Sequence, residues 1–408
     1  MTTTALSAPP DTRLYLIAVL SLTAVQMLST IAFNIAAVLA PAAAPALGVV
    51  PDDVAYYVSI VYLVSIGSAM AGGPMALRLG PVRLTQCGML VSAVGCVALA
   101  SGHLGLAIVS AVIVGLGGGP LTAASSQILS RVTPPRLSNL TFSIKQSGVP
   151  LGFALAGALV PISVELHGWQ AVAAAVAGIC LMTAIVLQPL RPLYDTHGTA
   201  GGRLLPTLHQ IIDPLKLAWA DPVLRRLCLA AISFSSMQAT IVNFMILYGV
   251  NGLLLDYVAA GIVLAFATAA GMVGRMFWGA LADVTRRPLM MLAVLGAIMA
   301  LGGVVMAAAQ PGWPSWLLHG VAVVLGGTAI GWNGVFISEC ARRAPPGRAG
   351  EFVGATSLFV FLGPVVWPVL FRGLLYVTHS YPMGFAIMAA ASGLSAVAIA
   401  SLLRQGER

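Results

Sequence analysis

Three cationic side chains lie inside long apolar stretches of the sequence, where a positive charge is unfavourable. They are Lys145, Arg275 and Arg372, and the other Lys and Arg residues lie between such stretches. A charge at the centre of a membrane-spanning helix costs about 2.5–3.5 kcal/mol on insertion scales, so it is expected to face a wet cavity or an anionic partner. Because a guanidinium can bind a carboxylate through two parallel hydrogen bonds, Arg275, with Lys145 beside it, is a candidate ligand for a small anion.

Helix geometry predicts how deep these cations lie. Arg275 precedes Asp283, at the edge of its apolar stretch, by eight residues. At 1.5 Å per residue it lies about 12 Å deep, near the midplane of a hydrocarbon core about 30 Å thick. Lys145 follows Asn139 by six residues and is expected about 9 Å deep. For both, extension toward the headgroups or pairing with a loop acid is the alternative; for Arg372, near the other end of its stretch, extension is expected.

Polar and aromatic side chains near the middle of other apolar stretches could complete an anion site. These candidates are Gln26, Asn34, Tyr62, Gln238, Asn243, Trp332 and Asn333. Gln26 and Gln238 each lie about thirteen residues into the first apolar stretch of one half of the chain, so they are symmetry-related. For each candidate, a hydrogen bond between helices is an equal alternative to contact with a substrate.

The sequence contains no arrangement typical of an enzyme or a metal site. The five Cys residues occur singly, without the spacing of a metal site or a disulfide framework. The glycine-rich segment 115–120 lies inside an apolar stretch, where close helix packing or bending is its expected role. Asp and Glu residues lie in loops or near the ends of stretches, with Asp256 the closest to an interior, so no carboxylate relay for protons or sodium is predicted. We expect no cofactor, no metal and no enzymatic activity.

The elements that carry these residues are expected to be membrane-spanning helices. Of 408 residues, 59% are hydrophobic and 8% are charged, whereas a soluble domain has about 25% charged residues. This composition excludes a soluble enzyme and a disordered protein, and the dispersed positive charges exclude a nucleic-acid-binding protein. We predict an all-α integral membrane protein in contact with lipids, monomeric, whose first apolar stretch is too long for a signal peptide and remains as a helix.

Twelve apolar stretches are long enough to span a membrane as helices. The predicted spans are 14–39, 54–76, 83–101, 104–130, 139–164, 168–190, 226–250, 254–281, 288–309, 314–339, 351–377 and 381–403. We therefore predict a six-helix half over 1–190, a linker over 191–224 and a second six-helix half over 225–408.

The positions of Lys and Arg predict the orientation. With the N-terminus in the cytoplasm, every Lys and Arg outside the spans lies in a cytoplasmic segment, and the external loops contain Asp52, Asp53 and Glu165 instead. Since cytoplasmic loops carry the excess of Lys and Arg, we predict a cell inner (plasma) membrane protein with both termini and the linker in the cytoplasm.

The two halves repeat each other weakly. Segment 127–136 reads QILSRVTPPR and segment 339–348 reads ECARRAPPGR, which places Glu339 on Gln127 and Arg343 on Arg131. Parallel six-helix repeats are a known plan of secondary transporters.

At these loops the chain resembles the major facilitator superfamily. The second half nearly matches the family's loop signature, Gly-x-x-x-Asp-Arg-x-Gly-Arg-Arg, with Gly279, Asp283, Arg286 and Arg287. The first half matches it only with Gly73, Arg78, Gly80 and Arg83, and Leu77 replaces the acid. The resemblance implies twelve helices in two pseudo-symmetric halves. It also implies cytoplasmic charge clusters that latch the outward-facing state, here Asp283 with Arg287 and Glu339 with Arg343.

Finer likenesses concern the substrate. The fourth span lacks the Arg that the family's proton-driven drug exporters have before a Gly-x-Gly. The run KQSGVPLG at 145–152 is similar to the fifth helix of the cyanate-permease-like branch. Arg275, four residues before Gly279, is similar to the carboxylate-binding Arg of oxalate and monocarboxylate carriers.

These observations predict a secondary carrier of a small organic or inorganic anion, most simply a mono- or dicarboxylate. Arg275 and Lys145 would hold the anion between the halves, which rock around it, and Pro150, Pro364 and Pro368 are expected bending points. An exporter of drugs or apolar metabolites, in which the cations are structural, is the first alternative. A membrane receptor or sensor is the second.

Overall fold

The computed structural model describes residues 12–134, 137–195, 216, 219–343 and 349–405. Within these residues, twelve helical spans are long and apolar enough to cross a membrane, as the sequence predicts. Side chains with large exposed apolar surfaces, such as Leu20, Val97 and Leu394, occur along many of these spans. The chain is therefore a multi-pass membrane protein whose outer surface suits lipid.

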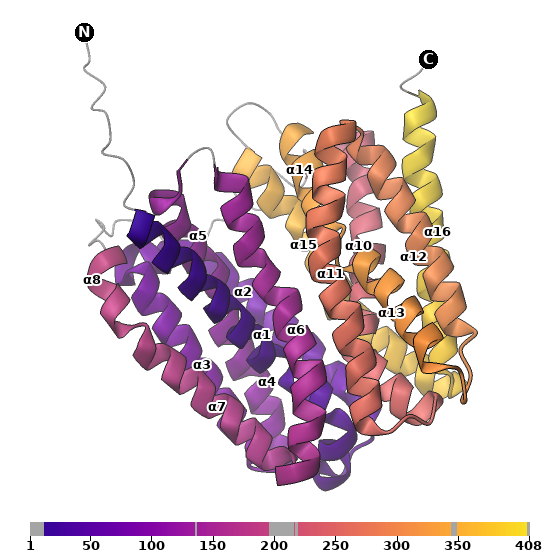
Figure 1. Ribbon diagram of the computed structural model, residues 1–408, viewed down its shortest axis with the longest axis horizontal. Coiled ribbons are helices and arrows are strands. Elements are labelled where there is room, and N and C mark those ends of the chain that lie inside the picture. Colours follow the sequence, from indigo (N-terminus) through magenta and orange to yellow (C-terminus); the bar gives the residue numbers. More distant parts are fainter. Residues whose placement is uncertain (1–11, 135–136, 196–215, 217–218, 344–348, 406–408) are drawn as a thin grey trace.

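The first half of the molecule (left in Figure 1) contains the spans up to Tyr194. Its helices are α1 (Thr12–Leu47), η1 (Pro51–Asp53), α2 (Val54–Leu79), α3 (Pro81–Ala100), α4 (Leu104–Gly118), α5 (Leu121–Val132), α6 (Ser138–His167), α7 (Trp169–Val186), η3 (Gln188–Leu190) and α8 (Arg191–Tyr194). The second half (right in Figure 1) contains α10 (Pro222–Leu247), η4 (Tyr248–Gly252), α11 (Tyr257–Thr285), α12 (Pro288–Ala307), α13 (Ser315–Ala329), α14 (Asn333–Arg343), α15 (Ala349–Thr378) and α16 (Tyr381–Gln405).

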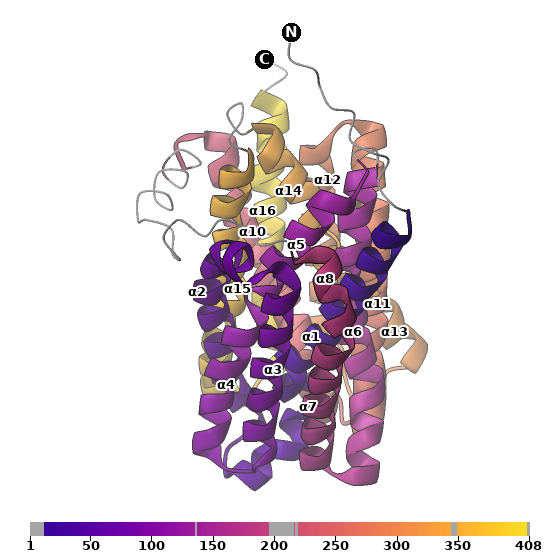
Figure 2. The ribbon, with the colours of Figure 1, turned by 90° about the vertical axis from the view of Figure 1, so that its left-hand side faces the viewer.

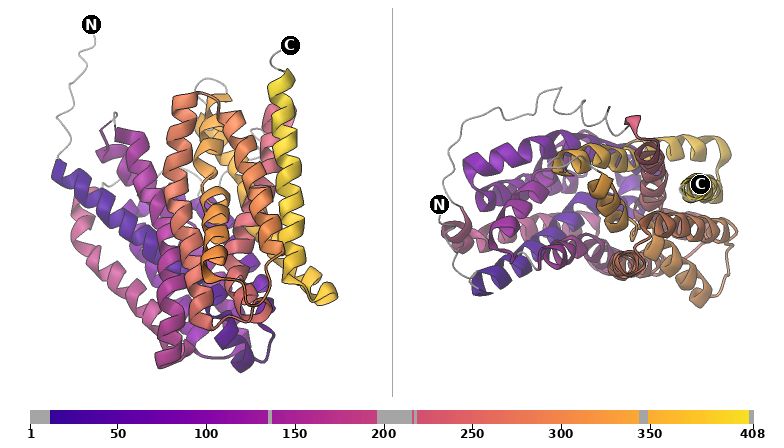
Figure 3. Two further views of the ribbon diagram at one scale, coloured as in Figure 1. Left: turned by 45° about the vertical axis from the view of Figure 1, so that its right-hand side comes forward. Right: turned by 90° about the horizontal axis from the view of Figure 1, so that it is seen from above.

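The two groups of helices lie side by side when viewed along the bundle (Figure 3, right). Between them, α6 packs on α11 and α2 packs on α15. The first turn of α1 and the last turn of α16 lie at the same end (Figures 1 and 2), which we term the terminal end; the other is the opposite end. Most of the predicted linker falls outside the described residues, so the exact domain limits stay a prediction.

The fourth and tenth spans are not continuous helices, contrary to the expectation from hydropathy. The fourth is interrupted at Gly119–Pro120 between α4 and α5, and the tenth at 330–332 between α13 and α14. Gly119 lies eight residues before Gln127, and Gly331 lies eight residues before Glu339, so the interruptions occupy equivalent places in the two halves. Both spans approach neighbours closely there: a Cβ on Gly119 would be 2.5 Å from the Ser65 carbonyl oxygen.

Glycine also allows the two halves to touch through their backbones. A Cβ on Gly261 of α11 would lie 2.3 Å from the carbonyl oxygen of Gly157 on α6. Membrane helices use small residues in this way to bring backbones together. The contact fixes α6 and α11 as neighbours, and these two helices carry Lys145 and Arg275.

Candidate functional site

A cavity of about 520 Å³ lies between the two halves and is lined by helices of both. Its apolar wall includes Phe33, Phe153 and Phe361. Its polar and charged lining consists of Gln26, Ser29, Thr30, Asn34, Tyr62, Ser65, Thr122, Ser126, Gln146, Ser235, Gln238, Arg275, Asn333 and Ser357. Among the described residues of this lining, Arg275 is the charged one, so the cavity combines one cation with many neutral hydrogen-bonding groups.

The structure brings six of the sequence-predicted candidates together at this cavity. They are Gln26, Asn34, Tyr62, Gln238, Arg275 and Asn333. Asn333 donates through Nδ2 to the Gln238 Oε1, 3.3 Å away, and so joins α14 to α10. Gln26 and Gln238, symmetry-related in the sequence, contribute to the wall from opposite halves.

Arg275 is held by two backbone carbonyl groups rather than by an acid. Its Nε donates to the Ile330 oxygen at 3.1 Å, and its Nη1 donates to the Gln146 oxygen at 3.3 Å. Both acceptors are released by interruptions of helical hydrogen bonding. Ile330 lies in the gap between α13 and α14, and Pro150 lacks the N–H that would otherwise bond to Gln146, four residues earlier.

This arrangement fixes the guanidinium without neutralising it. A guanidinium has five N–H donors, and the two carbonyl groups engage two of them. Within the described part of the chain, no ion pair involves Arg275. The side chain is therefore a preorganised cation with donors left for an anion.

Lys145 does not line the cavity, contrary to the expectation that it shares the anion with Arg275. Its side chain is only 1% exposed. Its Nζ lies 3.5 Å from the Oε1 of Gln146, at the limit of a hydrogen bond. Adjacent residues of a helix point about 100° apart, so Gln146 reaches the cavity while Lys145 turns into the helix bundle.

Two other candidates serve the packing of the second half instead of the cavity. Trp332 is fully buried against the rings of Phe234 and Phe336. Asn243 is buried and donates to the Ala239 carbonyl of its own helix. The interruption in the tenth span turns Trp332 inward and leaves Asn333 at the cavity.

Gln146 is the site residue that the sequence reasoning missed. Its backbone oxygen accepts from Arg275, its side chain contacts Lys145, and it lines the cavity. A signal was present, because Pro150 on a span implies a free carbonyl four residues before it. The small hydroxyl residues of the wall carried no such signal.

Arg372 pairs with an acid of the other half rather than extending toward the headgroups. Its Nε donates to the Asp53 Oδ1 at 2.8 Å, which joins α15 to η1 at the opposite end. The hydroxyl of Tyr381 hydrogen-bonds to Asp52, and Asn251 donates to the Tyr381 oxygen at 3.1 Å. Polar contacts thus tie the two halves together at the opposite end.

The predicted latch residues lie at the terminal end and differ in their surroundings. Glu339 is fully buried and accepts from Arg342 and Arg343 at 2.6 Å within α14. Asp283, Arg286 and Arg287 are exposed, as is Arg78. No ion pair of Asp283 occurs among the described residues, so the pair expected with Arg287 is not formed here.

Asp256, the acid expected closest to the interior of a span, lies outside its span and caps α11 by accepting from the Ala259 N–H at 2.7 Å.

Comparison with known proteins gives the family. The sequence model of the Major Facilitator Superfamily matches residues 22–368. The chain belongs to the Major Facilitator Superfamily. It is therefore a transporter rather than an enzyme, and the twelve spans of its described residues have the superfamily fold.

Solved structures agree with this fold. A crystal structure of a mutant of the peptide transporter POT in complex with alafosfalin has a TM-score of 0.74 at 17% identity and covers 95% of this chain and 94% of its own. A second structure of the mutant has a TM-score of 0.72 at 16% identity with the same coverage. At such identities the likeness concerns the fold alone.

One curated relative matches a shorter part of this superfamily member. "Probable anion transporter 5" of Arabidopsis thaliana is 30% identical over 149 residues. The match spans 34% of each chain, so the chain aligns with about a third of that relative's length.

Proposed function

We propose that this superfamily member is a secondary carrier of small organic anions, whose carboxylate binds Arg275 in the cavity between the halves. The observation that carries the proposal is the guanidinium held by two neutral carbonyl groups, with no acid beside it in the described residues. Two unit charges 4 Å apart attract by about 4 kcal/mol at an effective dielectric constant of 20. An anion is therefore the natural partner of this cavity, and the partial match to an anion transporter supports the same class.

The lining favours an anion with one negative charge. Because Lys145 lies outside the cavity, Arg275 alone would balance the substrate's charge. Amide and hydroxyl groups of Gln26, Gln238 and Asn333 suit the uncharged polar groups of the substrate. We infer a polar monocarboxylate rather than a dicarboxylate.

We further propose a monomer in the cell inner membrane with the terminal end in the cytoplasm, as the Lys and Arg distribution predicts. In that orientation, the Arg372–Asp53 and Tyr381–Asp52 contacts would close the external side. The structure would then represent a carrier closed to the outside. The halves would rock around the bound anion to alternate access.

Uptake into proteoliposomes tests the proposal. Radiolabelled mono- and dicarboxylates should be compared for wild type, Arg275→Ala and Arg275→Lys. We expect Arg275→Ala to abolish uptake, since a hydrogen bond to a charged group contributes about 1.5–3 kcal/mol and a bidentate pair more. Arg275→Lys should weaken uptake because the planar fork is lost.

Arg226→Lys is the matched control. Arg226 bonds to Ser401 at 2.9 Å, away from the cavity, so uptake should stay at the wild-type rate. If a folded Arg275→Ala carries the same carboxylate at the wild-type rate, Arg275 is structural. The exporter of drugs or apolar metabolites would then account better for the cavity.

A further inference from the structure

A second polar cavity, of about 330 Å³, lies at the terminal end of the first half. The end of α2, the start of α3 and the segment after α7 form its walls. Its charged lining consists of Arg78, Arg83, Arg191 and Asp195. Among the described residues, three guanidinium groups and one carboxylate therefore line this cavity, and Arg78 has a further interaction of its own.

The carboxylate of Asp195 is already engaged with the backbone. Its Oδ1 accepts from the Val82 N–H at 2.7 Å and its Oδ2 from the Arg83 N–H at 3.1 Å, which caps the start of α3. Gly80 permits this approach, because a Cβ there would lie 2.4 Å from the Asp195 Cγ. The Arg191 Nε is 3.7 Å from the same carboxylate, a long contact. The Asp195 carboxylate thus caps α3, and Arg83 and Arg191 leave the described part of the lining with an excess of positive charge.

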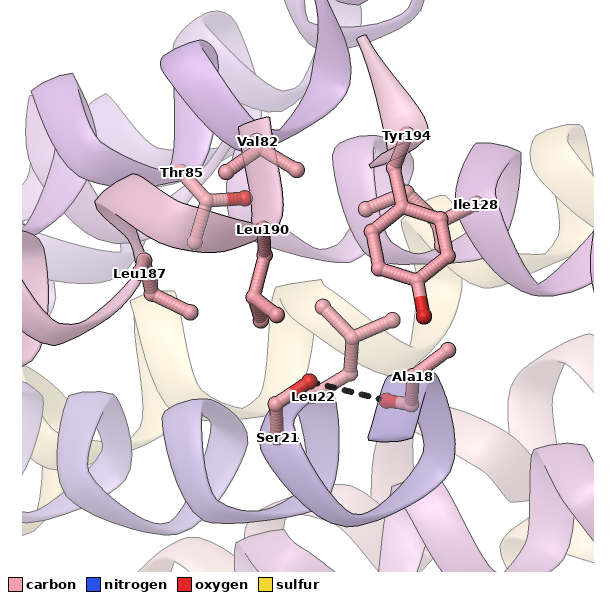
Figure 4. A pocket seen from close by; sticks show the side chains of 9 residues that line it. All are labelled: Ala18, Ser21, Leu22, Val82, Thr85, Ile128, Leu187, Leu190 and Tyr194. Carbon is pink, nitrogen blue, oxygen red and sulfur yellow. Dashed lines mark hydrogen bonds between the residues drawn. The ribbon is translucent and has the colours of Figure 1, made fainter. Parts of the chain in front are cut away.

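The wall that carries Arg191 is firmly attached to the helices beneath it. Figure 4 shows Leu187, Leu190 and Tyr194 around a small pocket together with residues of α1, α3 and α5. That pocket has a volume of only about 10 Å³, which is near the space that one water needs. Tyr194 also donates to the Leu14 carbonyl oxygen at 2.5 Å. Arg191 and Asp195 are therefore presented by a packed element.

Apolar side chains beside the cavity indicate its depth. Leu79 lines it and is 41% exposed, and Val186 and Leu193, on the neighbouring segment, are 66% and 48% exposed. In a membrane protein such residues face hydrocarbon, whereas Arg83 and Arg191 suit the headgroup level. The cavity therefore lies where the hydrocarbon core meets the headgroups.

We propose that this cavity binds the phosphate of an anionic phospholipid headgroup. Arg binds phosphate through parallel charge-assisted hydrogen bonds, and basic pockets between membrane helices suit anionic headgroups. The acyl chains would lie along Leu79, Val186 and Leu193. A free phosphate ion would share the headgroup chemistry but gain nothing from this apolar surface.

Lipid binding to the purified full-length protein tests the proposal. Native mass spectrometry should compare phosphatidylglycerol with phosphatidylcholine of the same chains, for wild type and for the double variant Arg83→Gln, Arg191→Gln. We expect wild type to retain phosphatidylglycerol preferentially, and the double variant to bind it at least about tenfold more weakly. Arg225→Gln, which removes an exposed positive charge from α10 in the other half, is the control and should retain the wild-type preference.

Two further measurements separate the remaining outcomes. If millimolar inorganic phosphate displaces phosphatidylglycerol, the ligand is free phosphate and the lipid assignment is overturned. Crosslinking of a photoreactive phosphatidylglycerol to the wild-type protein tests the site even if the double variant fails to fold. Labelling of segments 78–86 and 186–195 would support the site, whereas labelling confined to other segments, or unchanged binding in the double variant, would overturn it.

Discussion

Arg275 on α11 donates through Nη1 to the carbonyl oxygen of Gln146 on α6, 3.3 Å away, and so bonds the cation of the cavity to the other half of the molecule. A carboxylate bound through the remaining N–H groups would compete with this carbonyl for the position of the guanidinium, since a charge-assisted hydrogen bond is stronger than one to a neutral carbonyl. Anion binding is therefore expected to loosen α11 from α6, which couples occupancy of the cavity to movement of the halves.

This competition predicts the effect of Pro150→Ala. The variant restores an N–H that can bond to the Gln146 carbonyl oxygen within α6. The hydrogen bond from Arg275 to that oxygen is then weakened in the protein without an anion. A net hydrogen bond contributes about 0.5–1.5 kcal/mol, so we expect the anion Kd to fall about two- to twelvefold while turnover decreases. Titration of the purified protein gives Kd, and proteoliposome uptake gives turnover.

Pro45→Ala on α1 is the control for this variant, because Pro45 is exposed and distant from Arg275 in the fold. It should change neither quantity. A rise in Kd for Pro150→Ala would contradict the competition and would indicate that the carbonyl orients the guanidinium for binding.

Loss of the Arg372–Asp53 ion pair is expected to raise modestly the population of molecules that are open at the opposite end. Its side chains are 15% and 28% exposed, and an ion pair of this kind contributes about 0.2–1 kcal/mol. We therefore expect Asp53→Asn to raise the population open at that end by at most about fivefold. Distances between spin labels at positions 50 and 379 would measure it. The exchange Asp53→Arg with Arg372→Asp should restore the closed population, and Glu165→Gln should leave it unchanged; a failed rescue would rule out the pair as the cause.

Substitution of the exposed Asp283 is expected to change the balance between conformations. No ion pair of Asp283 forms among the described residues of this conformation. Asp283→Asn should therefore remove no contact from the conformation seen here. If Asp283 pairs across the halves when the terminal end closes, the variant should bias the protein toward the arrangement seen here. Spin-label distances across the terminal end would detect the bias, and an identical distribution in wild type and variant would mean that Asp283 only solvates its loop.

Replacement of Lys145 is expected to leave anion binding intact, in contrast to replacement of Arg275. A buried ammonium with one long contact contributes little to stability, and an apolar side chain of similar length can replace it without loss. We expect Lys145→Met to keep or raise the Tm and to change the anion Kd by less than about twofold. Thermal unfolding and binding titration check both. A loss of binding comparable with that of Arg275→Ala would contradict a cavity with one cation.

Hydropathy predicted the twelve spans, because lipid requires long apolar helices whatever the rest of the fold does. The membrane depth of Arg275, counted from Asp283, stays a prediction. The interruptions at Gly119–Pro120 and after Ala329 did not follow, since Gly and Pro also occur inside intact membrane helices. Whether a helix breaks there depends on neighbours such as Ser65, which no local pattern encodes.

The partners of the charged side chains did not follow from the sequence. Lys145 and Gln146 are adjacent, and only the rotation of α6 within the bundle decides which of them reaches the cavity. Arg372 and Asp53 are 319 positions apart in the sequence, so their pairing depends on how the halves meet. A single sequence contains the charges of such a pair but not the approach that joins them.

The backbone contact between Gly157 and Gly261 can act as a fulcrum. The two backbones meet directly there, beside the rigid ring of Pro161 and the Cβ of Leu264, so one helix can tilt against the other with few side chains to rearrange. About nineteen residues of α6 separate Gly157 from Ser138, a lever arm of about 29 Å. A tilt of about 10° around this point would carry the start of α6 through about 5 Å and its end at His167, ten residues away, through about half that distance, so the two ends of the bundle would open unequally.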